Sequence, residues 1–240
     1  MINIEKQEWV GEFLAYMEKF DPLFRSKICG ANEMDIQEIE KNLGVSLPQD
    51  YREYMENMGQ NDGGLFENSR AKTNVTELLE IIKIIREERP DVDFKNFIPI
   101  ASCDNVEGWA LTKKDNQWQV VTINNNLPGD YVARSLPDLV FYTGFSKQVS
   151  LAPHQVRFKI GNKNIKLSDI EAQASSMGFI TEPFCDNLSY FGIKNDILLM
   201  VHTSLTIGFE GFVASSDLNS AQKEANQLVE VLGGIISAVR

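Results

Sequence analysis

The sequence predicts an α+β protein in two parts, and three observations support this prediction. Apolar residues follow helical spacing through most of residues 1–90, whereas short segments typical of antiparallel strands dominate afterwards. The length of 240 residues suits one large or two small domains. The density of charge drops, and Pro153 interrupts the chain, near residues 147–154. We therefore expect one domain over 1–148 and a smaller, two-layer α+β domain over 152–240.

Four helices are predicted before the first strand, each with an apolar stripe at helical spacing. Asn32 is a good N-cap for the second helix, and Gly44 stands at its C-terminal end, where a positive φ is common. Pro48 favours the first turn of the third helix, and Gly59 stops it. The predicted ranges are 4–20, 33–43, 48–58 and 75–89.

Strands follow the fourth helix. Residues 97–101 form a short apolar run. Residues 108–112 and 117–123 flank the polar stretch 113–116, which predicts a hairpin with a four-residue turn. A closing helix is expected over 135–145.

The segment around the second and third helices resembles the signature of the SUKH superfamily, the Smi/Knr-type group around the fungal regulator of glucan synthesis. An apolar-Glu-x-x-Leu-Gly step ends one helix at Leu43-Gly44, Leu47-Pro48 follows, and Tyr51 and Tyr54 lie three apart on the next helix. An Asn/Gly-rich loop over 57–64 completes the pattern. The resemblance covers roughly residues 1–148, and the long helix over 75–89 departs from it.

This resemblance implies a protein-binding module without a catalytic site. Bacterial SUKH proteins are commonly immunity proteins that neutralise toxins, often nucleases, whereas the fungal member is a regulatory or scaffold protein in cell-wall (glucan) synthesis. We expect the first role here and keep the second as the alternative. The motif residues have a structural explanation as well, because Gly44 permits a positive φ and the tyrosines fill a core.

The C-terminal part resembles no family that its residues identify. Ser168 to Glu171 reads as a capping box that opens a helix. Ser216 or Asp217 would cap a second helix, and Gly233-Gly234 would end it before a last strand, although a continuous helix to residue 240 is an alternative. Helices on one face of a sheet are expected. The predicted strands are 156–160, 188–193, 197–203, 205–214 and 235–239.

The sequence contains little that would support catalysis or cofactor binding. It holds two histidines, His154 and His202, and no His-x-x-x-His, Cys-x-x-Cys, Gly-x-Ser-x-Gly or Walker pattern. We expect no enzyme activity, no cofactor and no metal. If the chain were an enzyme, His202, Cys185 and scattered carboxylates would be the candidate residues, whereas Cys103 reads as a small buried residue.

Cysteine usage and hydropathy indicate a cytoplasmic protein with no membrane segment. Cys29, Cys103 and Cys185 lie far apart, which favours reduced thiols over a disulfide framework or a zinc site. The longest apolar run, 197–201, is far shorter than a membrane span. The first residues lack the features of a signal peptide.

Charge predicts the kind of partner. The net charge is −11, which argues against direct binding of nucleic acid. Residues 1–150 hold 16 Lys and Arg against 25 Asp and Glu, a net charge of −9, which leaves −2 for residues 151–240. A basic protein such as a toxin domain would be steered to the acidic part. The candidate partner-binding residues are Glu38, Glu53, Glu56, Asp62, Glu67, Asp104 and Glu107.

Overall fold

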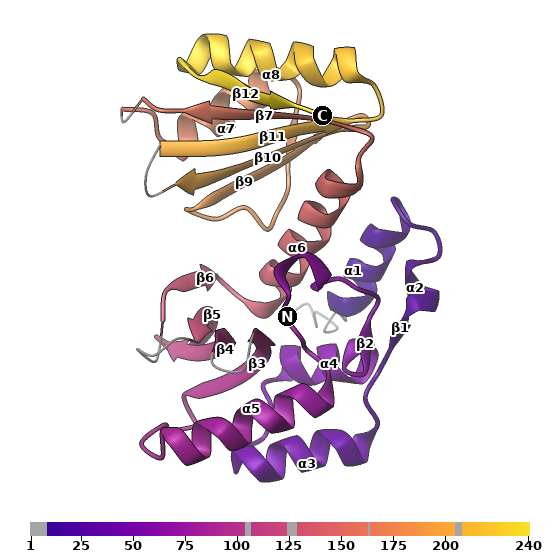
Figure 1. Ribbon diagram of the computed structural model, residues 1–240, viewed down its shortest axis with the longest axis vertical. Coiled ribbons are helices and arrows are strands. Elements are labelled where there is room, and N and C mark those ends of the chain that lie inside the picture. The colour runs from indigo at the N-terminus through magenta and orange to yellow at the C-terminus, as the bar shows by residue number, and fades with distance from the viewer. Residues whose placement is uncertain (1–8, 104–106, 124–128, 163, 205–207) are drawn as a thin grey trace, which may run out of the picture. The chain divides into compact units, whose positions relative to one another are not determined.

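The computed structural model describes residues 9–103, 107–123, 129–162, 164–204 and 208–240 (Figure 1). Helices and antiparallel strands are both present, which confirms the α+β class. The chain divides into two compact units, Met1–Thr143 and Gly144–Arg240. The domain limits 1–148 and 152–240 stay a prediction. Among the described residues, no helix is long and apolar enough to cross a membrane.

The four predicted helices are present, but the first ends at Glu18 rather than at residue 20, and its predicted start at residue 4 lies outside the described residues. A short helix over Phe24–Lys27 was not predicted. Asn32 Oδ1 accepts a hydrogen bond from the Asp35 N–H at 3.0 Å, and Gly44 closes the same helix with a φ of 72°. Pro48 is the N-cap of the next helix, so that helix begins one residue later than predicted. The helices are α1 (Trp9–Glu18), α2 (Phe24–Lys27), α3 (Glu33–Leu43), α4 (Gln49–Met58) and α5 (Val75–Glu88).

A short extended segment covers the C-terminal end of α4. Two small strands, β1 (Ile28–Cys29) and β2 (Asn61–Asp62), pair in antiparallel fashion. The next residue along from β1, Gly30, approaches α4 so closely that a Cβ on it would lie 1.8 Å from the Glu56 carbonyl oxygen. The neighbouring Ala31 N–H donates to the Met55 carbonyl at 2.8 Å. A glycine is therefore required here by close backbone approach rather than by its φ.

A four-stranded antiparallel meander follows α5 (Figure 1). The hairpin was predicted correctly, but its turn is shorter than expected because pairing continues to Lys114 opposite Gln117. Only Asp115 and Asn116 form the turn. Both have a positive φ, as the two central residues of a type I′ hairpin turn require. The strands are β3 (Phe97–Cys103), β4 (Glu107–Lys114), β5 (Gln117–Ile123) and β6 (Tyr131–Ala133), the last of which was not predicted.

The helix α6 (Leu136–Leu151) is longer than the predicted 135–145. Phe145 and Val149, four residues apart and buried, continue its apolar stripe. The predicted connector is therefore mostly helical, and the helix ends two residues before Pro153, whose ring and missing N–H disfavour further helix.

The second unit contains a six-stranded antiparallel sheet in the order β12-β7-β11-β10-β9-β8. The last strand was predicted correctly, and the alternative of a continuous helix to residue 240 is wrong. Gly233 adopts a φ of 68° and ends the helix before it. The two-residue β8 was not predicted. The strands are β7 (His154–Ile160), β8 (Ile180–Thr181), β9 (Ser189–Lys194), β10 (Ile197–Ser204), β11 (Gly208–Ser215) and β12 (Ile235–Val239).

Two helices pack on this sheet, α7 (Leu167–Ser176) and α8 (Leu218–Leu232) (Figure 1). Of the two predicted N-cap residues, Ser216 and Asp217, it is Asp217 that caps α8. The capping box was predicted at the wrong residues. Lys166, not Ser168, is the N-cap of α7, and the Asp169 carboxylate accepts a hydrogen bond from the Lys166 N–H at 2.8 Å. Val156 and Phe158 of β7 join the helices in one core, whereas Phe191, on the opposite face of the sheet, packs against Phe145 of α6.

Candidate functional site

A polar pocket of ≈ 390 Å³ lies on the first unit. The loop between α4 and α5, which contains the end of the Asn/Gly-rich segment of the family motif, forms its walls. Gln60, Asn61, Asp62, Gly64, Glu67, Ala71, Lys72, Thr73 and Asn74 line it. Two of the predicted partner-binding residues, Asp62 and Glu67, meet in this pocket.

Side chains of the loop hold its own backbone in shape. Asp62 Oδ1 accepts hydrogen bonds from the N–H groups of Gly64 at 2.8 Å and Leu65 at 3.1 Å. Asn61 Oδ1 accepts from the Gly63 N–H at 2.9 Å. Gly63 and Gly64 both have positive φ, which glycine adopts without the steric cost that other residues incur. The two consecutive glycines are therefore what allows the acidic loop to turn back on itself.

A buried hydrogen-bond relay connects the core to the pocket. The Tyr54 hydroxyl of α4 donates to Thr73 Oγ1 at 3.0 Å, and the Thr73 hydroxyl donates to Asp62 Oδ2 at 3.2 Å. Burial, and secondarily the negative charge of Asp62, raise the pKa of Tyr54 far above its usual value, so its hydroxyl stays protonated and donates. Both carboxylate oxygens of Asp62 are therefore fixed from within the fold.

The rim of the pocket carries charges of both signs. Lys72 Nζ lies 3.0 Å from Glu77 Oε1, and Asn74 caps α5 by accepting from the Glu77 N–H. Gln60 Nε2 donates to Asp35 Oδ2 at 2.8 Å. Glu67 begins a short 3₁₀ turn, Glu67–Ser69, and is exposed. The pocket can therefore accept hydrogen bonds from a cationic or amide group through carboxylate and amide oxygens.

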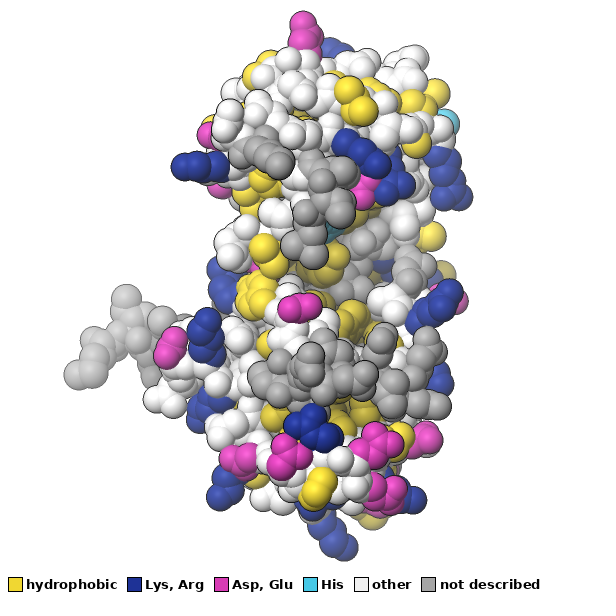
Figure 2. Space-filling model, turned by 60° about the vertical axis from the view of Figure 1, so that its left-hand side comes forward, with side chains coloured by type: hydrophobic (Ala, Val, Ile, Leu, Met, Phe, Trp, Pro, Cys, Tyr) yellow, Lys and Arg dark blue, Asp and Glu magenta, His cyan; other side chains and the backbone are white. Residues whose placement is uncertain are grey.

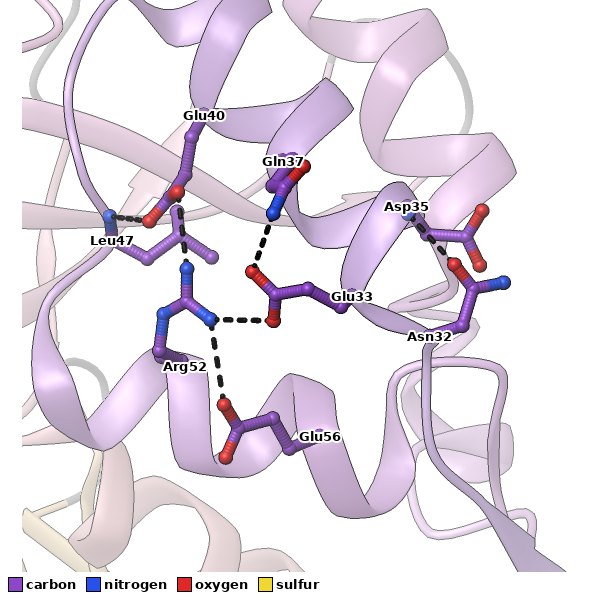
Figure 3. A network of polar contacts seen from close by, with 8 residues as sticks. All are labelled: Asn32, Glu33, Asp35, Gln37, Glu40, Leu47, Arg52 and Glu56. Carbon is purple, nitrogen blue, oxygen red and sulfur yellow. Dashed lines mark hydrogen bonds and ion pairs between the residues drawn. The ribbon is translucent and has the colours of Figure 1, made fainter.

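A second cluster of glutamates, on α3 and α4, surrounds Arg52 (Figure 3). Its Nη1 lies 3.0 Å from Glu33 Oε2 and 3.4 Å from Glu56 Oε1, and its Nη2 lies 3.1 Å from Glu40 Oε2. Glu40, the glutamate of the family motif, also accepts from the Leu47 N–H at 2.9 Å. Hydrogen bonds from Gln37 and then Arg52 lower the pKa of Glu33. One guanidinium therefore connects α3 to α4 and offsets part of this acidity.

The structure places the seven predicted partner-binding residues in different settings. Glu38 and Glu67 are exposed. Glu53 accepts from the Val10 N–H of α1 at 2.8 Å, Glu56 pairs with Arg52, and Asp62 holds the loop. Glu107 begins β4, and Asp104 lies outside the described residues. Of the seven, Asp62 and Glu67 line the pocket together, and a role in binding a partner stays a prediction for the whole set.

The described residues on the face drawn in Figure 2 do not form one uniform acidic patch. On the face drawn in Figure 2, Asp and Glu side chains alternate with Lys and Arg side chains. Residues that the sequence did not single out, among them Lys72 and Thr73, complete the pocket. Their only signal in the sequence was their position, between a glycine-rich loop and the N-cap residue Asn74.

His202 and Cys185, two of the candidate residues for an enzyme, are half-buried in the second unit and hydrogen-bond to neighbouring groups. His202 Nδ1 lies 2.9 Å from Ser189 Oγ, and burial lowers the pKa of this histidine. Burial raises the pKa of the Cys185 thiol to about 11, where the reactive thiolate is scarce at neutral pH. Across the described ranges, His, Cys, Asp and Glu side chains form no group of three or more that could hold a metal ion.

Comparison with known protein families finds a match to one segment of the first unit. The model of the SMI1 / KNR4 family (SUKH-1) matches residues 30–141, from Gly30 beside α4 to Phe141 in α6. No curated protein matches the chain. The matched range contains the Leu43-Gly44 helix end, the Arg52 network and the whole pocket. Residues 30–141 of this chain are therefore similar to the SMI1 / KNR4 family (SUKH-1).

Proposed function

We propose that this chain is a non-enzymatic binding protein that neutralises a bacterial toxin with a basic surface. The observation that supports it most is the pocket over residues 60–74, where Asp62 and Glu67 meet within the family-matched region. The similarity of residues 30–141 to the SMI1 / KNR4 family (SUKH-1) is consistent with this role, because the SUKH resemblance implies immunity proteins. A nuclease is a suitable target, since a surface that binds phosphate must be positively charged.

The chemistry of recognition follows from the pocket. Asp62 is fixed by three internal hydrogen bonds, while Glu67 lies exposed in the 3₁₀ turn. A Lys or Arg side chain of the toxin would enter between them and donate to Glu67 and to the amide oxygens of the rim. The net charge of −9 over residues 1–150 would raise the rate of association by electrostatic steering.

The first experiment tests binding and charge together. The purified chain is immobilised, and proteins secreted by competing bacteria are passed over it, identified by mass spectrometry and purified. We expect a basic toxin whose association rate falls as salt rises, because the Debye length shrinks from about 10 Å at 0.1 M salt to about 3 Å at 1 M. A rate that does not change with salt would contradict steering.

Matched charge reversals locate the surface. Glu67→Lys changes an exposed pocket residue, and Glu171→Lys makes the same charge change on exposed α7 in the second unit. We expect Glu67→Lys to weaken toxin binding at least tenfold, about 1.4 kcal/mol, and Glu171→Lys to leave it nearly unchanged. Equal effects of the two variants would show that the pocket is not the binding site.

A titration separates binding from catalysis. If the chain acts by binding, toxin activity disappears only when the chain reaches equimolar concentration, and activity returns when salt dissociates the complex. An enzyme that inactivates the toxin would act well below equimolar concentration and irreversibly. His202→Ala should leave inhibition intact, because the proposed surface does not include this residue.

A further inference from the structure

The strand β12 is an edge of the six-stranded sheet in the second unit. Within the described part of the chain it pairs with β7, and no strand lies on its outer side. An edge of this kind presents a row of backbone N–H and C=O groups to a partner. The opposite edge, β8, is only two residues long, so β12 is the longer template for pairing.

The side chains of β12 lack the features that normally protect an edge. Residues 235–239 contain no charged residue and no proline, although lysine and proline are the usual means of preventing edge pairing. Ile235 is 65% exposed and Val239 46% exposed, and Val231 of the adjoining α8 is 60% exposed. The register shifts between Ile236 and Ala238, but the Ser237 hydroxyl donates to the Arg157 carbonyl and holds this bulge against β7. Exposed apolar side chains therefore lie along β12, and no strand of the described chain pairs with its outer edge.

We propose that β12 pairs with β12 of a second copy, antiparallel and across a two-fold axis. A two-fold contact uses the same surface on both copies, so β12 of each copy can hydrogen-bond to β12 of the other. Antiparallel pairing brings the Arg240 end of one strand toward the C-terminal end of α8 in the other copy, where the exposed Glu230 lies in the last turn of the helix. These opposite charges are complementary in the antiparallel arrangement.

The charge distribution also favours this surface for self-association. Residues 151–240 carry a net charge of only −2, whereas residues 1–150 carry −9. Two copies that meet through the second unit therefore avoid most of the like-charge repulsion that the first unit would create. This inference does not depend on the proposed toxin binding.

The test is the molar mass of the full chain in solution, measured by light scattering during gel filtration over a concentration series. We expect the wild type to reach twice the chain mass of 27.1 kDa. Ile235→Lys places a charge on the proposed interface and should give the mass of one chain. Ile180→Lys is the matched control, because Ile180 is 74% exposed on the opposite edge strand β8, and it should stay dimeric.

A second measurement keeps the test valid if Ile235→Lys folds poorly. Amide hydrogen exchange at residues 235–239 of the wild type should slow as concentration rises, because the dimer hydrogen-bonds the outer edge. The proposal is overturned if the wild type remains monomeric, if the folded Ile235→Lys chain remains dimeric, or if Ile180→Lys dissociates the dimer instead. Exchange at 235–239 that is independent of concentration would also overturn it.

Discussion

The Tyr54 hydroxyl donates to Thr73 Oγ1 at 3.0 Å inside the first unit, and this contact connects the family motif to the pocket. Tyr54 is 1% exposed and Thr73 6% exposed. Thr73 in turn donates to Asp62, which holds the loop at Gly64 and Leu65. The motif tyrosine therefore supports the pocket without lining it.

Removal of this hydroxyl should destabilise the fold. Tyr54→Phe keeps the ring but leaves Thr73 Oγ1 without its donor, so we expect a loss of about 1 kcal/mol in the free energy of unfolding. Urea unfolding followed by circular dichroism measures it. The pocket should also loosen, which would appear as faster amide exchange at residues 62–65.

Tyr51→Phe is the matched control for that prediction. Tyr51 is also fully buried and stacks on Tyr54 with ring centroids 6.3 Å apart, but its hydroxyl has no hydrogen-bond partner among the described residues. Removing a buried, unsatisfied hydroxyl should be neutral or stabilising. If both variants lose the same stability, the Tyr54–Thr73 hydrogen bond is not the cause.

The Arg52 network predicts a stability that depends on salt. Arg52→Met keeps the aliphatic stem but removes the cation shared by Glu33, Glu40 and Glu56. We expect a loss of about 1 kcal/mol, larger at low salt because the remaining carboxylates then repel each other with less screening.

Lys83→Met serves as the control for Arg52→Met. Lys83 and Glu87 form one pair at 4.0 Å, and their side chains are 74% and 66% exposed. The expected change is roughly 0–0.5 kcal/mol. Unfolding curves at two salt concentrations compare the variants, and an Arg52→Met loss that is unaffected by salt would contradict the role of charge.

Helix ends were predictable because their signals are local. Asn32, Gly44, Asp217 and Gly233 each act within four residues of their own position, and all four cap the predicted helices. Short strands were not predictable in the same way. The three residues of β6 and the two of β8 are too few to show alternation, and their pairing with β5 and β9 is fixed only when the chain folds.

The roles of the acidic residues depend on partners far along the chain, which explains why the sequence could not separate them. Glu53 accepts from Val10, which lies 43 residues away, and Arg52 reaches Glu33 and Glu40 on another helix. From the sequence alone, these carboxylates looked the same as the exposed Glu38 and Glu67. Only the folded chain distinguishes carboxylates with internal partners from those that face solvent.

His202 should make stability depend on pH. Burial lowers its pKa below the usual 6.5, and the charges of Asp186 and Glu210 only partly oppose this. The unfolded chain therefore takes up the proton first, so stability is full above the usual histidine pKa and falls as pH drops from there toward the folded pKa. The free energy of unfolding between about pH 7.5 and pH 5.5 measures this contribution.

His202→Asn isolates this contribution from that of other groups. Asparagine can still hydrogen-bond to Ser189 but does not titrate. We expect the variant to lose less stability than the wild type as pH falls across that range. If the two pH profiles are parallel, proton uptake at His202 does not contribute.

Gly30 allows the extended segment after β1 to approach α4. A Cβ at this position would lie 1.8 Å from the Glu56 carbonyl oxygen, which is backbone and cannot rotate away. Gly30→Ala should therefore push the segment off α4 and strain the hydrogen bond from the Ala31 N–H to the Met55 carbonyl. Overpacking of this kind costs roughly 1–3 kcal/mol, measurable by thermal or urea unfolding.

Gly11→Ala makes the same chemical change where there is room for it. Gly11 lies within α1, and a Cβ there would meet nothing within 4 Å. Because alanine favours helix over glycine, we expect a gain of roughly 0.5–1 kcal/mol. Opposite signs for the two variants would show that close backbone approach, rather than the general flexibility of glycine, explains Gly30. A gain in stability from Gly30→Ala would mean that the segment does not contact α4 as the structure shows.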